Sequence, residues 1–232
     1  TNHKNLIIMK ELKSKVILIG DASVGKTSLI LRYFERKFTS EIQSTIGTNF
    51  FTKIFPEEPT PDRKVLHKMD VWDTCGQERF MAIASVFYKN ANAVVFVVDA
   101  SNRKTLEKAE EYLKEVKSNQ TTPQFILLCV NKIDLLPAFK EGQPVTSEVL
   151  ASCPFFDDIE SFAKSNKFDG VLWSSAKESL NVDKIFEILD EAVVTKKIQL
   201  DAPCIKSKKK FVQSITRDNN PMRNSSSGGC CS

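Results

Sequence analysis

The chain has 232 residues, of which 41% are hydrophobic and 27% charged, as in ordinary globular proteins. No apolar run approaches the ~20 residues of a membrane helix, and the first residues lack a signal-peptide core, so we expect a cytosolic protein with reduced cysteines. The net charge of +4 comes entirely from residues 201–232, which leaves residues 1–200 formally neutral and argues against nucleic-acid binding.

Strand and helix patterns alternate along the chain. Strands are predicted at 15–19, 48–55, 65–72, 93–99, 125–130 and 170–174, and helices at 25–36, 77–90, 102–118, 155–166 and 181–197. The alternation predicts an α/β fold with a mostly parallel sheet and helices on both faces. No helix separates the second strand from the third, so we expect these two to form an antiparallel hairpin at one edge.

The connections and the tail complete this organisation. Three prolines in 55–64 predict a stiff, exposed hairpin loop, and 135–154 is predicted as a second long loop. Beyond about residue 200 the hydrophobic periodicity stops, and such a segment cannot bury enough apolar surface to fold. We therefore predict an N-terminal extension over 1–9, one domain over 10–200 and a disordered tail over 201–232.

The first strand leads into a phosphate-binding loop. Residues 20–27 read Gly-Asp-Ala-Ser-Val-Gly-Lys-Thr and match G-x-x-x-x-G-K-[ST] between a strand and a helix. The glycines let backbone N–H groups point inward, Lys26 is expected to reach the β- and γ-phosphates, and Thr27 to bind Mg²⁺. A chance glycine turn is the weaker interpretation. The predicted nucleoside triphosphate contacts are Gly20, Asp21, Ala22, Ser23, Val24, Gly25, Lys26, Thr27 and Ser28.

Two later motifs predict that the base is guanine. Asn131-Lys132-Ile133-Asp134 follows the strand 125–130, and Asp134 can accept hydrogen bonds from N1–H and the 2-amino group of guanine, which adenine lacks. Ser175-Ala176-Lys177 follows the strand 170–174 and can offer a backbone N–H to the guanine oxygen. The carboxyl ends of the strands of an open α/β sheet meet at the ligand, so we expect both motifs there.

A third motif, Asp73-Thr74-Cys75-Gly76-Gln77, follows the strand 65–72. Asp73 is expected to hold Mg²⁺ through water, the Gly76 N–H to meet the γ-phosphate, and Gln77 to orient the attacking water. Over residues 15–195 these motifs resemble the Ras superfamily of small GTPases. The resemblance implies the P-loop small GTPase fold with a six-stranded sheet, GTP/GDP and Mg²⁺ as cofactors, hydrolysis of GTP, Thr45 as a switch-one magnesium ligand, and Phe38 against the guanine.

Residues 45–50, 72–80 and 87–91 are similar to the Rab branch, which regulates vesicle traffic and protein transport. The similarity implies an effector-facing aromatic triad at Phe50, Trp72 and Phe87, for which plain packing is the alternative. It also implies a guanine exchange factor, a GTPase-activating protein, effectors at the switch regions, and prenylation escort and GDP-dissociation inhibitor proteins. The expected state is a monomer on the cytoplasmic face of an intracellular membrane that cycles with the cytosol.

Several positions depart from the family's pattern. Cys75 stands where alanine is usual and is interpreted as a replacement of similar volume, with a redox role as the alternative. Asn49 replaces a usual acidic residue and leaves effector identity open. Ala22 and Cys75 keep open a second hypothesis, a GTP-binding scaffold that hardly hydrolyses. The loops 55–64 and 135–154 are longer than usual, and are either neutral or specific for partners.

The chain ends Gly229-Cys230-Cys231-Ser232. Gly229 occupies the position where a C-a-a-X signal needs cysteine, which excludes that route. The paired cysteines resemble the Rab double geranylgeranylation site, and two lipid chains anchor a protein stably where one does not. Lys206 and Lys208–Lys210 would add attraction to an anionic leaflet. The alternatives are a solvated charge run with idle thiols, and a soluble nuclear-transport GTPase, which would lack these cysteines.

Overall fold

The computed structural model describes residues 10–40, 45, 48–56, 65–74, 89–118, 123–195, 198 and 200. All of these belong to the unit Thr1–Asp201, and a second unit, Ala202–Ser232, lies outside the described residues. The described strands are β1 (Lys10–Ile19), β2 (Thr48–Phe55), β3 (Val65–Thr74), β4 (Ala93–Asp99), β5 (Phe125–Asn131) and β6 (Gly170–Trp173). The described helices are α1 (Lys26–Glu35), α3 (Lys104–Ser118), α4 (Ser147–Ala151), α5 (Phe156–Ser165), α6 (Val182–Val194) and the short 3₁₀ helix η2 (Ile133–Leu135).

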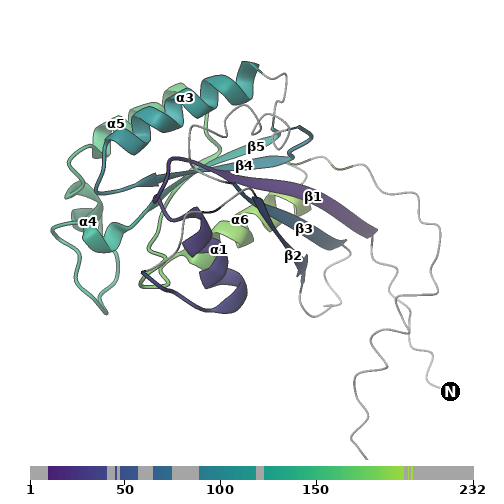
Figure 1. Cartoon of the computed structure of the whole chain (residues 1–232), viewed down its shortest axis with the longest axis horizontal. Coiled ribbons are helices and arrows are strands. Elements are labelled where there is room, and N and C mark those ends of the chain that lie inside the picture. Colours follow the sequence, from purple (N-terminus) through teal and green to yellow (C-terminus); the bar gives the residue numbers. More distant parts are fainter. Residues whose placement is uncertain are drawn as a thin grey trace, which may run out of the picture. The chain divides into compact units, whose positions relative to one another are not determined.

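The strands form one sheet in the order β2-β3-β1-β4-β5-β6 (Figure 1). From β3 to β6 all neighbours pair in parallel, and β2 pairs antiparallel with β3 at the edge. β4 is buried along its whole length, as a central parallel strand covered on both faces should be. The predicted fold class, a six-stranded mostly parallel sheet with one antiparallel edge strand, is therefore confirmed.

Apolar side chains fill two layers, one on each face of the sheet. Figure 1 shows α1 and α6 on one side and α3 and α5 on the other. Leu29 of α1 and Phe186 of α6 belong to the first layer, and Leu113 of α3 and Ile159 of α5 to the second. The last helix buries apolar side chains at three- and four-residue steps, at Val182, Ile185, Phe186, Leu189 and Val193.

Two elements differ from the predictions. β1 begins at Lys10 rather than at residue 15, because the segment from Lys10 to Ser14 pairs in parallel with the start of β3. The loop predicted over 135–154 contains the end of η2 and the helix α4, whose cap Thr146 accepts a hydrogen bond from Val149 N–H at 3.4 Å. Five residues are too few to show a helical period in the sequence. The predicted helix 77–90 lies largely outside the described residues.

A buried polar triad joins β1, β3 and α6. His67 Nε2 lies 2.7 Å from Ser14 Oγ, and His67 Nδ1 lies 2.8 Å from Asp190 Oδ1. The three residue types are those of a hydrolytic triad, but Ser14 is 1% and His67 0% exposed, so a substrate has no access to the hydroxyl. We interpret the triad as a network that satisfies buried polar groups across the interface between sheet and helix.

Candidate nucleotide-binding site

The loop between β1 and α1 needs glycine at both ends. Gly20 has φ +151° and Gly25, which caps α1, has φ +97°. A Cβ on Gly20 would lie 2.2 Å from the Val97 carbonyl oxygen, and one on Gly25 would lie 2.4 Å from Asn131 Nδ2. The loop therefore lies directly against β4 and the end of β5. Because glycine caps α1, no side chain of the cap residue takes the first N–H groups of the helix, which is the arrangement that binds phosphate.

Gly25→Ala is expected to weaken GDP binding by about a hundredfold or more, because the new methyl group displaces the Asn131 amide and the loop with it. Gly142→Ala is the matched control: Gly142 also has a positive φ of +74°, but its Cβ would meet nothing within 4 Å. The control should lose about 1 kcal/mol of stability and keep its affinity. Titration with a fluorescent GDP measures both variants, and equal losses of affinity would contradict the role given to the close contact.

The Lys26 side chain folds back over the phosphate loop. Its Nζ donates hydrogen bonds to Gly20 O and Asp21 O, both at 2.8 Å, and the residue is only 5% exposed. Burying an ammonium group costs free energy unless it is hydrogen-bonded, and these two carbonyls supply the hydrogen bonds. The positive charge thus lies within the loop that the sequence predicts to bind the β- and γ-phosphates.

Three side chains predicted to bind Mg²⁺ come together at the start of α1. Thr27 Oγ1 donates to Asp73 Oδ2 at 2.8 Å and lies 2.8 Å from Thr45 Oγ1. Asp73 is 0% exposed, and its Oδ1 has no hydrogen-bond partner among the residues that the structure describes. Burial raises the pKa of Asp73, while the hydrogen bond from Thr27, the charge of Lys26 and a hydrogen bond from Asn49 lower it. Hydroxyl and carboxylate oxygens, one of them buried and unpaired, fit Mg²⁺.

Asn131 connects the phosphate loop with the loop after β6. Its Nδ2 donates to Val24 O at 2.9 Å, and its Oδ1 accepts from Ala176 N–H at 3.1 Å and from Ser174 Oγ at 3.3 Å. The side chain is 1% exposed. Asn131 therefore fixes the distance between the segment predicted to bind phosphate and the segment predicted to bind guanine.

Asp134 and Ser175 meet at the guanine end of the site. Ser175 Oγ donates to Asp134 Oδ1 at 2.5 Å and accepts from Glu178 N–H at 3.1 Å. A backbone pairing between Ser175 and Leu180 holds the loop after β6 in place. The carboxylate of Asp134 is half-buried and has a fixed orientation, which a selective acceptor for guanine requires.

Asp99, which lies outside the predicted motifs, holds Lys132. Its Oδ2 lies 2.7 Å from Lys132 Nζ, and its Oδ1 accepts from the N–H and the hydroxyl of Ser101. Lys132 has a left-handed φ of +66°, and the bond from Ile133 N–H to Ser174 O at 3.1 Å holds the backbone directly after it. A carboxylate at the C-terminal end of the strand 93–99 was the available signal, because strand ends are where ligands bind.

Phe38 lies beyond the end of α1, where its ring is 37% exposed. The guanidinium carbon of Arg32 is 5.5 Å from the centre of that ring, and Arg32 also bonds to the loop after β6. Arg32 is a second residue of this region that the motifs did not indicate. Phe38 and the loop after β6 thus both contact the side chain of Arg32.

The predicted effector surface is described only in part. Phe50 is 53% exposed, and its ring meets that of Trp72 edge to face, with centroids 5.2 Å apart. Lys15 Nζ lies 4.8 Å from the centre of a Trp72 ring and donates to Lys89 O at 2.9 Å. The third aromatic, Phe87, lies outside the described residues, as do Cys75, Gly76, Gln77, Cys230 and Cys231. Their predicted roles stay predictions.

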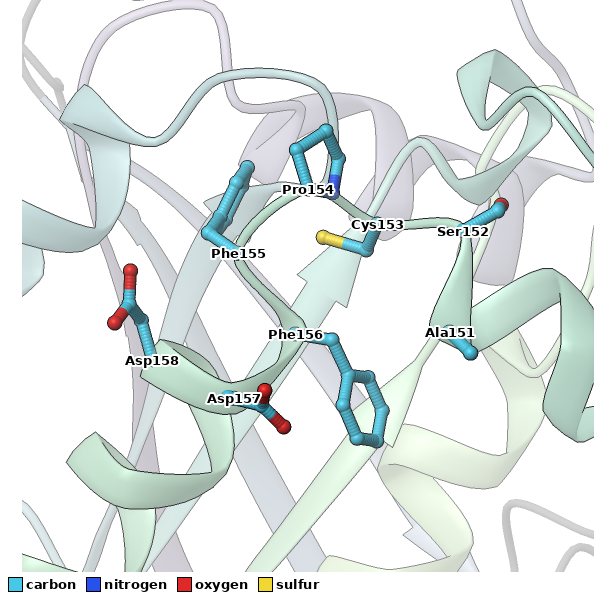
Figure 2. A pocket seen from close by; sticks show the side chains of 8 residues that line it. All are labelled: Ala151, Ser152, Cys153, Pro154, Phe155, Phe156, Asp157 and Asp158. Carbon is cyan, nitrogen blue, oxygen red and sulfur yellow. The ribbon is translucent and has the colours of Figure 1, made fainter.

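A cavity of about 510 Å³ opens at the junction of α4 and α5. Figure 2 shows its lining side chains, among them Cys153, Phe156 and Asp158. It is formed by residues 151–158, and no residue predicted to bind nucleotide is among them. Burial raises the pKa of the Cys153 thiol, which keeps it in the unreactive protonated form. This cavity is separate from the nucleotide site.

Comparison with known proteins agrees with the geometry. The sequence profile of the Ras family matches residues 15–195. The Ypt/Rab-type GTPase YPT7 of Saccharomyces cerevisiae is 37% identical over 75% of this chain and 77% of its own length. The Ypt/Rab-type GTPase Rab7 of Gibberella zeae is 35% identical over 78% and 82%, and the Ras-related protein Rab-7L1 of Homo sapiens is 29% identical over 94% and 96%. The chain therefore belongs to the Ras family, in its Ypt/Rab group of small GTPases.

Proposed function

We propose that the carboxyl edge of the sheet holds GTP or GDP with Mg²⁺, with the phosphates at Lys26 and the base at Asp134. The supporting observation is that the ends of β1, β3, β5 and β6 are joined here by direct hydrogen bonds between the predicted site residues. The bond from Asn131 to Val24 O links the phosphate end with the base end. The segments predicted to bind phosphate and base thus form one continuous site, as a nucleotide requires.

At the phosphate end, Mg²⁺ neutralises charge on the phosphate oxygens when it is bound. The hydroxyls of Thr27 and Thr45 and the carboxylate of Asp73 would hold it. Lys26 donates to a phosphate oxygen in place of a loop carbonyl, and the N–H groups at the start of α1 donate to the others. Gly76 N–H and Gln77, assigned from their motif, meet the γ-phosphate and orient the attacking water.

The chain is a small GTPase that converts GTP and water to GDP and phosphate, and it acts in vesicle trafficking. Membership of the Ypt/Rab group does not favour the alternative of a scaffold without hydrolysis. We infer that the γ-phosphate holds Thr45 and Gly76 in place, so that its loss releases both switch segments. Hydrolysis would then reset the surface that effectors recognise.

Competition against a bound fluorescent GDP tests the assignment of the base. GTP should displace the probe at equal concentration, whereas ATP should fail at about a thousandfold excess, because adenine leaves the Asp134 carboxylate without its donors. Displacement by ATP at a similar concentration to GTP would overturn the proposed selection of guanine.

A Ypt/Rab GTPase works in general with exchange factors, GTPase-activating proteins, effectors and GDP-dissociation inhibitors. We propose that effectors contact the surface of Phe50, Trp72 and Phe87. There the exposed ring of Phe50 packs edge to face against the half-buried ring of Trp72. We also propose that the activating protein contributes a positive charge at the γ-phosphate, as arginine fingers do in comparable GTPases.

Within the described part of the chain, no helix combines the length and apolarity that crossing a bilayer requires. The trafficking role of the Ypt/Rab group points to endomembranes. We propose that this chain is held at their cytoplasmic face by double geranylgeranylation of Cys230 and Cys231, aided by Lys206 and Lys208–Lys210, and that escort and GDP-dissociation inhibitor proteins return it to the cytosol.

Replacing Cys230 and Cys231 with serine is expected to move the protein from the membrane pellet to the supernatant of fractionated cells. Either single replacement should give an intermediate distribution, because one lipid chain binds only marginally. Cys204→Ser, in the same segment of the chain, is the matched control and should stay in the pellet. A double variant that pellets like the unmodified protein would refute lipid anchoring at these cysteines.

A further inference from the structure

Arg32, in the last turn of α1, reaches the loop after β6. Its Nε donates to Ala176 O and its Nη2 donates to Lys177 O, both at 2.8 Å. Two consecutive main-chain carbonyls are thus held by one planar guanidinium group. Nη1 makes a longer bond of 3.4 Å to Arg36 O, which fixes the side chain against the end of its own helix. Arg32 therefore ties the guanine loop to the helix that begins at the phosphate loop.

The same guanidinium group supports Phe38. Arg36, directly after α1, adopts a left-handed conformation with φ +57°, which ends the helix before Phe38. The Arg32 guanidinium carbon lies 5.5 Å from the centre of the Phe38 ring, within the range of a cation–π interaction. Arg32 is half-buried and the ring is 37% exposed. One side chain thus contacts both Phe38 and the Ser175–Lys177 loop, which are predicted to bind the guanine.

We propose that Arg32 is a positioning residue that controls how long the guanine nucleotide stays bound. It holds the Ala176–Lys177 backbone and Phe38 at a fixed separation, so that the base enters a preformed slot. This inference rests on the proposed nucleotide site and adds a positioning residue to it. Arginine suits this geometry better than lysine, because its planar guanidinium donates to the two carbonyls from separate nitrogens while the same plane can lie against a ring.

The test measures release of fluorescent GDP from the full chain with Mg²⁺, after addition of excess unlabelled GDP. Arg32→Ala should release GDP about tenfold faster or more, because two charge-assisted hydrogen bonds and a ring contact are lost. Arg32→Lys should lie between Arg32→Ala and the unmodified protein. Arg36→Ala is the matched control, since it removes an arginine four residues along whose side chain pairs with Asp183 of α6 at 2.6 Å. Its release rate should change less than twofold.

A second readout separates positioning from general loosening of the fold. The Mg²⁺ concentration that half-saturates GDP binding should stay the same in Arg32→Ala, because the contacts of Arg32 are to the base end and not to Thr27 or Asp73. Faster release together with a shift of that Mg²⁺ concentration would overturn the inference, and so would equal acceleration by Arg36→Ala or no acceleration by Arg32→Ala.

Asp134→Asn in the same release assay distinguishes this inference from the proposed site. If Asp134→Asn releases GDP faster and Arg32→Ala does not, the site stands and the role of Arg32 fails. If neither variant releases GDP faster, the guanine assignment itself fails.

Discussion

Asp134→Asn is expected to change the preferred nucleotide from GTP to xanthosine triphosphate. Ser175 Oγ donates to Asp134 Oδ1, and this oxygen remains an acceptor in asparagine. The amide nitrogen then replaces Oδ2 and meets the 2-amino group of guanine donor to donor. Xanthine carries an oxygen at that position and restores the pairing. Because the site is built from hydrogen bonds, the loss of GTP affinity should be about a thousandfold or more.

Competition against fluorescent GDP and fluorescent xanthosine diphosphate measures this exchange. Asp183→Asn is the matched control, since it makes the same chemical change at an exposed carboxylate of α6 that pairs with Arg36. The control should keep the preference for GTP. Retention of that preference in Asp134→Asn would contradict the place given to the base.

Asp73→Asn is expected to have opposite effects on Mg²⁺ binding and on the stability of the nucleotide-free protein. Burial raises the pKa of Asp73, so the folded chain binds the proton of this group more tightly than the unfolded chain does. The ionised form therefore destabilises the fold at neutral pH, and that cost is lost when pH falls. Asparagine removes the charge and raises stability without nucleotide, but it lowers Mg²⁺ affinity by about tenfold to a hundredfold.

Thermal unfolding in EDTA without nucleotide, and GDP affinity as a function of Mg²⁺ concentration, measure the two effects. Asp70→Asn on the same strand is the control, because Asp70 is also buried but is paired with Lys13 at 2.7 Å and accepts from Thr52 at 2.8 Å. That variant should lose stability and keep its Mg²⁺ affinity. If Asp73→Asn lost as much stability as Asp70→Asn, the buried charge of Asp73 would be stabilised by the protein alone, which would contradict this prediction.

The segments that bear the site could be predicted because their chemistry is local. The phosphate loop needs glycine at both ends within one short segment, and the structure shows the close contacts at Gly20 and Gly25 that require it. The strands before Asn131 and Ser175 are continuous apolar runs, so the position of both motifs at strand ends followed from the pattern.

The partners of these segments could not be predicted, because they depend on pairings across long stretches of chain. Arg32 meets Ala176 across 144 residues, and nothing in the helical pattern of α1 distinguishes this arginine from Arg36. In the sequence, Asp99 is only the polar end of a buried strand, and its ion pair with Lys132 becomes evident only from the fold. Ser14, likewise, is only a polar residue before a strand until His67 is known to lie 2.7 Å away.

The helix α4 illustrates a different limit of prediction. Its five residues, Ser147–Ala151, bury Val149 and are too short to show a period, so they read as part of a long polar loop. Whether residues 135–154 and 55–64 carry partner specificity stays a prediction. The cavity at 151–158 lies where the first of these segments meets α5.

Single-turnover hydrolysis tests the central claim most directly. The full chain is loaded with GTP and Mg²⁺, freed of excess nucleotide, and GDP is followed by chromatography, with Gln77→Leu in parallel. We predict slow formation of GDP by the unmodified chain and none above background by the variant, because leucine cannot orient the attacking water. GTP that stays intact in both proteins, or GDP that forms at the same rate in both, would contradict a self-resetting switch in which Gln77 positions the water.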